Sequence, residues 1–468
     1  MMKHEGAMQS MFRKYGWMPA IGALALIGCT KTEEAGAICY PEVSRGWIAA
    51  AAEPPSTTSD PGGAYRIYLD GSGSMAGYIR GATGEERPLG DLIGMLPDLP
   101  TIDRSDVGII RFDEEFTDLT PSEATASMGT AAGYGNRDSY IDQVLERIAK
   151  DNAQSLSVLV SDLWLVNGNV LTSGPVALSP KFSRIIASGR SIAIYGFEVP
   201  YAGRVSDLPS GNRAVNATRR HLFVLVAGPV ARLQAFHGAM ETASSPSIAA
   251  YMANGNVRYT LFTTDPSQTK LGGTQSFTPQ RGTPLTKKSF LPARTGVRIP
   301  QYSLDKRQAL RADGVVPGVR WQGVTAATMR PGAVWQGPAS GATTVYREIG
   351  NDCAANGGDW ADDGSLGAGW LPDGGFLLDP TELATLNSGR YLLVGALRRT
   401  DLTVPNPASQ WMRDWSFSAA SEEEAITRPV MPTLNLAELA RLLEIEVQRS
   451  IRAKPVVAGG FAVAVEIE

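Results

Sequence analysis

The segment that best predicts the fold is Tyr65-Arg66-Ile67-Tyr68-Leu69-Asp70-Gly71-Ser72-Gly73-Ser74. Its first half is an apolar run typical of a buried strand, and a Gly/Ser turn follows directly. The turn presents one carboxylate, Asp70, and two alternate hydroxyls, Ser72 and Ser74. Because Mg²⁺ prefers oxygen ligands and keeps some of its water, these side chains suit a hard divalent cation. A plain turn between a strand and a helix is the alternative interpretation.

Two later segments carry polar residues of the same kind. The run Ser157-Val158-Leu159-Val160-Ser161-Asp162 is short, apolar and ends in Ser-Asp, which is typical of a fully buried strand of a parallel sheet. Ser139 opens a stretch to Lys150 with helical periodicity. The apolar residues on one face of that expected helix are Ile141, Val144, Leu145 and Ile148.

In their order along the chain, these three segments resemble the metal-ion-dependent adhesion site of von Willebrand factor type A domains. The resemblance implies a doubly wound, mostly parallel α/β sheet. The implied metal ligands are Asp70, Ser72, Ser74, Ser139 and Asp162. In this family one coordination position stays open to a carboxylate of a protein partner, so the metal joins two proteins.

The resemblance leaves two positions open. Ser139 stands where the family usually has Thr, and the neighbouring Asp138 is an alternative ligand. An extra carboxylate would favour Ca²⁺ or Mn²⁺ over Mg²⁺. Trp164, two residues after Asp162, is either a partner contact at the rim of the metal face or a buried packing residue.

The N-terminus has the features of an exported lipoprotein. A basic segment at 11–16 precedes an apolar run at 17–27, which is shorter than the roughly 20 residues of a spanning helix. Leu26-Ile27-Gly28-Cys29 then resembles a bacterial lipobox. That resemblance makes residues 1–28 a signal peptide and Cys29 the lipidated first residue. A plain signal peptide is the alternative.

The lipobox implies a location in the bacterial cell envelope. Thr30, rather than Asp, follows the cysteine, which favours the outer membrane over the inner membrane. Either Met1 or Met11 could be the start of the chain. An oxidising envelope would permit a disulfide between Cys39 and Cys353, the two cysteines that remain.

The rest of the chain divides into a linker and two domains. Residues 29–63 include a Pro-, Gly- and Ser-rich stretch typical of a flexible linker. Residues 64–244 alternate strand-like and helix-like segments, which predicts βαβ units around a parallel sheet. Residues 245–468 favour a β-rich α+β accessory region with one clear helix at 435–452. We expect a further strand at 411–417.

In a parallel sheet, ligands bind beyond the carboxyl ends of the strands. The strands expected in residues 64–244 are 65–69, 107–112, 157–161, 191–197 and 221–227. Asp70, Ser72, Ser74 and Asp162 all fall just after such strand ends. The fold and the metal ligands are therefore predicted consistently.

Composition limits the classes of function. The 468 residues carry a formal charge of −4, and loss of residues 1–28 leaves the chain near −6. A mildly acidic chain lacks the basic field that attracts nucleic acid. The sequence also lacks a phosphate-binding loop, a zinc-protease motif and a serine-hydrolase elbow. We therefore expect a binding protein rather than an enzyme. The alternatives are a metal-independent envelope scaffold and, less favoured, a hydrolase in residues 245–468.

Overall fold

The structure is a computed structural model. It describes residues 63–84, 86–99, 107–135, 138–164, 175–205, 208–211, 215–242, 245–266, 277–292, 298–311, 316–322, 329–334, 340–349, 360–366, 369–371, 375–399 and 401–468. The predicted signal peptide, the lipidated Cys29, the linker up to residue 62, Cys39 and Cys353 lie outside these residues.

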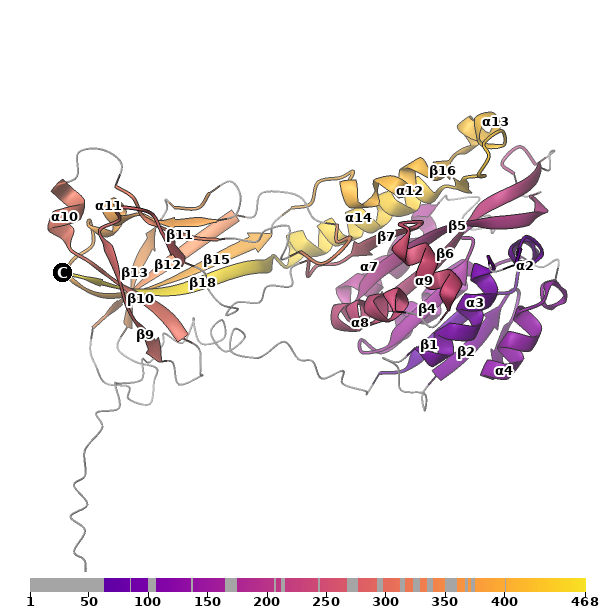
Figure 1. Ribbon diagram of the computed structural model, residues 1–468, viewed down its shortest axis with the longest axis horizontal. Coiled ribbons are helices and arrows are strands. Elements are labelled where there is room, and N and C mark those ends of the chain that lie inside the picture. The colour runs from indigo at the N-terminus through magenta and orange to yellow at the C-terminus, as the bar shows by residue number, and fades with distance from the viewer. Residues whose placement is uncertain are drawn as a thin grey trace, which may run out of the picture. The chain divides into compact units, whose positions relative to one another are not determined.

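A seven-stranded sheet carries the predicted site (Figure 1). The strand order is β3-β2-β1-β4-β6-β5-β7. The bounds are β1 Tyr65–Asp70, β2 Val107–Phe112, β3 Phe116–Leu119, β4 Leu156–Ser161, β5 Ser191–Val205, β6 Val215–Gly228 and β7 Val257–Phe262. β1 pairs in parallel with both β2 and β4, so the two strands that bear the predicted ligands are parallel neighbours.

The predicted α/β class is confirmed, but the prediction of a doubly wound, mostly parallel sheet is wrong. The β2–β3, β4–β6, β5–β6 and β5–β7 pairings are all antiparallel. The cause lies in the connection from Val205 to Val215, which is shorter than the dozen or so residues of a parallel crossover. β5 and β6 therefore fold back on each other as a long ribbon, and β6 lies between β4 and β5.

Helices cover both faces of this sheet, because successive side chains of a strand point to opposite faces. Val158 and Val160 of β4 join one hydrophobic core, and Leu159 joins the other. The first core includes residues of α3 Pro88–Met95, α8 Val230–Glu241 and α9 Pro246–Ala253. The second includes residues of α5 Ile141–Lys150, α7 Ser179–Ala187 and α14 Leu436–Ala453.

The C-terminal segment contributes to the core of the seven-stranded sheet. α14 lies along α7 (Figure 1), and its apolar face is buried in the second core. The buried residues of that face include Leu439, Leu443, Val447 and Ile451. β7 also lies after residue 244 and still pairs with β5. The core therefore draws on residues from both sides of the predicted boundary at 244/245.

The prediction of a strand at 411–417 is wrong for most of these residues. Gln410–Asp414 forms the short helix α12, and only Ser416–Phe417 is extended, as β16, beside β17 at Thr433–Leu434. The two tryptophans Trp411 and Trp415 are four residues apart, a spacing that places them on one face of a helix. They pack against Gly196 of β5, where a Cβ atom would lie 2.7 Å from each indole ring.

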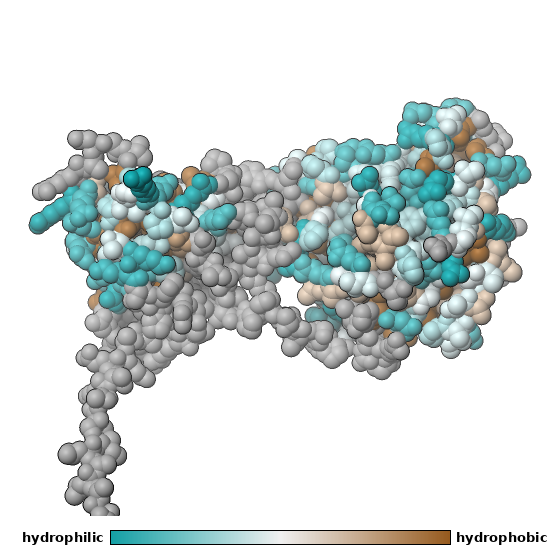
Figure 2. Space-filling view, in the orientation of Figure 1, coloured by the Kyte–Doolittle hydropathy of each residue, from teal (hydrophilic) through white to brown (hydrophobic). Residues whose placement is uncertain are grey.

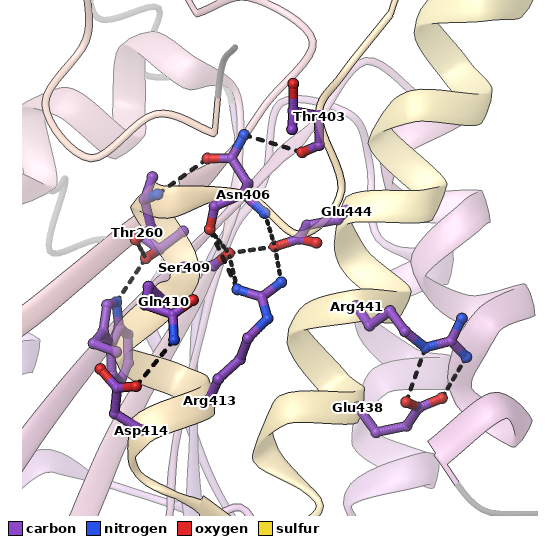
Figure 3. A network of polar contacts seen from close by, with 12 residues as sticks. Thr260, Thr403, Asn406, Ser409, Gln410, Arg413, Asp414, Glu438, Arg441 and Glu444 are labelled. Carbon is purple, nitrogen blue, oxygen red and sulfur yellow. Dashed lines mark hydrogen bonds and ion pairs between the residues drawn. The ribbon is translucent and has the colours of Figure 1, made fainter.

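A buried ion pair fastens α12 to α14 (Figure 3). Glu444 of α14 is fully buried, and its Oε1 atom lies 2.6 Å from Nη2 of Arg413. The same carboxylate accepts hydrogen bonds from the Ser409 hydroxyl and from the backbone N–H of Asn406. Breaking a buried pair leaves an uncompensated charge, so this network fixes the C-terminal segment in one register.

We expect Leu443→Ala to destabilise the chain by about 2–5 kcal/mol, since it deletes a fully buried side chain between α14 and the sheet. Arg441→Ala, on the exposed side of the same helix, should change stability by less than about 1 kcal/mol. Urea unfolding followed by tryptophan fluorescence measures both. Equal, small effects would show that α14 does not belong to this core.

A second group of strands forms a six-stranded sheet in the order β13-β12-β15-β18-β10-β9. Its bounds are β9 Leu285–Pro292, β10 Arg298–Leu304, β12 Ser340–Glu348, β13 Trp360–Leu366, β15 Gly389–Arg399 and β18 Val456–Ile467. A three-stranded sheet comprises β8 Phe277–Pro279, β11 Val319–Trp321 and β14 Phe376–Leu378. The aromatic ring of Phe461 lies at the centre of their core, 4.6 Å from that of Phe376.

The helices of the described residues include none that is both long enough and apolar enough to cross a membrane.

Candidate metal site

The predicted ligands converge on Asp70, at the carboxyl end of β1. Leu69 lies opposite Val160 in the parallel register, which brings the ends of β1 and β4 together. Asp70 is 1% exposed. Its Oδ2 atom accepts hydrogen bonds from the hydroxyls of Ser161, at 2.6 Å, and of Ser139, at 2.9 Å. The ends of two strands and the loop before α5 thus meet at one carboxylate.

The Gly/Ser turn closes the other side of this carboxylate. The backbone N–H of Ser72 donates to Oδ1 of Asp70 at 2.9 Å. The hydroxyls of Ser72 and Ser74 lie 3.2 Å apart. Gly71 allows a close approach, because a Cβ atom there would lie 3.1 Å from the Arg111 side chain, which would have to shift slightly. The turn therefore presents two hydroxyl oxygens to the region that Asp70 faces.

Asp162 lies beside Asp70 and is also 1% exposed. Its Oδ1 atom accepts the backbone N–H of Trp164 at 3.1 Å. Its Oδ2 atom is buried and has no hydrogen-bond partner among the described residues, although it lies 3.3 Å from Nη2 of Arg220. This oxygen therefore interacts with the charge of Arg220 without a hydrogen bond from any residue that the structure describes.

Two residues of the site were not predicted from the sequence. Ser161 appeared only as the last residue of a strand, yet it donates to Asp70. Its place directly before Asp162, where a strand ends, is the signal that could have identified it. Arg220, in β6, carried no such signal, because the pairing of β6 with β4 joins residues far apart in the sequence.

Arg220 is held in a cage of aromatic rings. Its side chain is 3% exposed, and its guanidinium carbon lies 4.6 Å from the ring centroid of Trp164 and 4.9 Å from that of Tyr201. Such cation–π contacts stabilise a desolvated guanidinium. Trp164 itself is 5% exposed, which matches the buried packing alternative rather than a partner contact at the rim.

Asp138 and Ser139 differ in their surroundings. Ser139 is half-buried and reaches Asp70, whereas Asp138 is exposed. Of the two alternatives, Ser139 is therefore the residue that contacts Asp70 in the structure.

Burial and like charge both act on Asp70. Burial raises the pKa of this carboxyl, the neighbouring Asp162 raises it further, and hydrogen bonds from Ser161 and Ser72 partly oppose them, so that the pKa is about 6. Burial lowers the pKa of Arg220, but the opposing influence of Tyr78 and Asp162 leaves it raised. The guanidinium is therefore charged throughout the physiological range.

This raised pKa predicts that protons and cations compete for Asp70. Divalent ions bind the ionised carboxylate, so we expect the affinity for Mn²⁺ or Mg²⁺ to fall about tenfold between pH 7 and pH 5. Between pH 7 and pH 8 the affinity should be nearly constant. Titration calorimetry in buffers of equal ionic strength measures the profile. An affinity independent of pH from 5 to 8 would exclude Asp70 as a ligand.

A cation at this site would depend on hydroxyl ligands. The described residues contain no group of three or more His, Cys, Asp or Glu side chains placed to hold a metal. Mg²⁺, Mn²⁺ and Ca²⁺ prefer oxygen ligands. The site offers such ligands in two carboxylates and in the hydroxyls of Ser72, Ser74 and Ser139. Comparison of the chain with protein-family models, with curated proteins and with solved structures finds no match.

Proposed function

We propose that the chain is a lipid-anchored lipoprotein of the bacterial envelope, which binds a protein partner through a divalent cation held beside Asp70. The observation that carries the proposal is the convergence of Asp70, Ser72, Ser74, Ser139 and Asp162 from three separate segments. The sequence around Cys29 supports the anchor. The proposal assigns no catalytic activity to the chain.

The oxygen donors suit a hard cation, with Mg²⁺ as the first choice and Mn²⁺ or Ca²⁺ as alternatives. When bound, the ion would supply a Lewis-acid position for one more oxygen ligand. The two carboxylates then face one divalent charge and the charge of Arg220, so the site as a whole is positive. A carboxylate of the partner would neutralise it, which favours an acidic side chain as the element recognised.

A second candidate function is a scaffold that needs no metal. Arg220 already pairs with Asp162, and serine hydroxyls already donate to Asp70. Both carboxylates therefore have partners in the metal-free chain, as they would if the cluster only stabilised the fold.

Chelation distinguishes the two candidates. The full chain is immobilised and loaded with envelope extract in the presence of Mg²⁺, and an Asp70→Asn column serves as the matched control. We expect partner proteins to elute with EDTA and to be missing from the Asp70→Asn column. Proteins retained equally on both columns, and resistant to EDTA, would contradict the proposal and support the scaffold.

A further inference from the structure

A pocket of about 380 Å³ lies next to the edge of the seven-stranded sheet, and none of its described lining residues belongs to the cluster around Asp70. β7 pairs with β5 only from Ile192 to Phe197, whereas β5 continues to Val205 along β6. The pocket lies beside this continuation, between α9, the turn before β7 and the end of α12. Its main lining residues are Glu86, Glu198, Arg219, Tyr251, Arg258 and Trp415.

The polar groups on one side of the pocket are ordered before any ligand arrives. Arg219 bridges two carboxylates, with Nε 3.2 Å from Glu198 and Nη2 3.4 Å from Glu86. The Tyr251 hydroxyl donates to the same Glu86 oxygen at 2.6 Å. The side chains of Arg219, Glu86 and Glu198 remain 36–39% exposed, so they keep hydrogen-bonding capacity toward solvent. Preorganised groups of this kind lower the entropic cost of binding.

The opposite side adds donors and acceptors. Arg258, Asn254 and Asn256 are exposed and line the pocket. The Ser247 hydroxyl, also in the lining, is buried and has no hydrogen-bond partner among the described residues. Donors and acceptors therefore line this side of the pocket as well.

An aromatic ring of fixed orientation completes the pocket. Trp415 stacks on the buried His221 with ring centroids 4.0 Å apart and planes at 6°. It also contacts Trp411 edge to face, at 5.1 Å. These contacts hold the indole in one orientation beside the polar groups. An aromatic ring next to hydrogen-bonding groups binds ligands that have both an apolar face and a polar edge.

The charges of the lining balance, with Glu86 and Glu198 opposed by Arg219 and Arg258. A strongly charged ligand is therefore not favoured, whereas a neutral ligand rich in hydroxyls can use the donors, the acceptors and the aromatic ring together. We infer that this pocket binds a neutral sugar of one or two rings, as a free saccharide or as the end of a glycan.

Ligand-observed NMR tests the inference. Saturation transfer from the full chain is measured to millimolar glucose, N-acetylglucosamine, cellobiose and N,N′-diacetylchitobiose. We expect saturation transfer to at least one sugar. The double variant Arg258→Met, Asn254→Ala should bind that sugar with about tenfold lower affinity, since two polar contacts are lost. Both positions are exposed, so the variant should keep its fold. Arg441→Met, on the exposed side of α14, is the matched control and should bind as the unaltered chain does.

The same spectra separate this inference from the metal-dependent function. Sugar binding should persist in EDTA and in Asp70→Asn. Transfer to none of the four sugars would overturn the inference, and so would equal transfer in the pocket variant and the Arg441→Met control. Either result would leave the metal proposal unaffected, because its own test uses Asp70.

Discussion

Arg220→Met is expected to destabilise the metal-free chain by about 3–5 kcal/mol, because it removes one partner of a buried ion pair. Asp162 would keep a charge with 1% exposure and lose the guanidinium 3.3 Å away. Methionine is apolar and unbranched, so it replaces the aliphatic part of Arg220 but leaves unfilled the space that the guanidinium holds beside Trp164 and Tyr201. The loss measured therefore combines the unpaired charge of Asp162 with a small cavity. Urea unfolding in EDTA at pH 7.5 gives the value.

The adjacent Arg219→Met is the matched control. Arg219 has the same charge and also contacts carboxylates, but its side chain is 36% exposed. Exposed ion pairs contribute at most about 1 kcal/mol, so the control should lose little stability. Mg²⁺ should stabilise Arg220→Met more than the unaltered chain, because the ion no longer meets a neighbouring positive charge. Equal losses in the two variants, with no additional effect of Mg²⁺, would show that Arg220 and the site are not coupled.

Asp70→Asn is expected to have opposite effects with and without metal. The folded-state pKa of Asp70, about 6, lies above the ordinary value of 3.8. Its contribution to stability is therefore greatest below pH 3.8 and is lost as the pH rises through 6, to a total of up to about 3 kcal/mol. In EDTA at pH 7.5 the asparagine avoids this cost, so the variant should melt at a higher temperature than the unaltered chain.

With divalent ions present the order should reverse. An ion at about a thousand times its dissociation constant stabilises the folded chain by about 4.1 kcal/mol, more than the cost that asparagine avoids, and the variant should gain none of this. Asp118→Asn, an exposed position on β3, is the control and should behave as the unaltered chain does in both conditions. A variant that melts lower in EDTA, or that is still stabilised by the ion, would contradict the role given to Asp70.

Local patterns predicted the elements that carry the site. The apolar run before Asp70 forms β1, the run before Asp162 forms β4, and the periodicity after Ser139 forms α5. These features depend on residues close together in the sequence, where side-chain period reflects burial directly. The parallel pairing of β1 and β4 then brings Asp162 beside Asp70, as predicted, and also brings Ser161, which was not predicted.

The parts that were not predicted depend on pairing between distant segments. The direction of a strand in a sheet cannot be derived from an apolar run alone. The antiparallel pairing of β6 with β4 was therefore not predicted, and neither was the place of Arg220 beside Asp162. The aromatic run at 411–417 is compatible with a strand by propensity and with a helix by residue spacing. The packing of Trp411 and Trp415 against Gly196 favours the helix. The burial of α14 against α7 likewise depends on tertiary contact.

Titration calorimetry measures whether Asp70, with Ser72, Ser74 and Ser139, holds a divalent cation. Mn²⁺, Mg²⁺ and Ca²⁺ are titrated into the full chain and into Asp70→Asn at pH 7.5, with millimolar acetate present to supply the outer carboxylate. We expect saturable binding of one ion per chain for at least one of the metals, and none in the variant. Absence of binding to the folded, unaltered chain, or equal binding to both proteins, would contradict it.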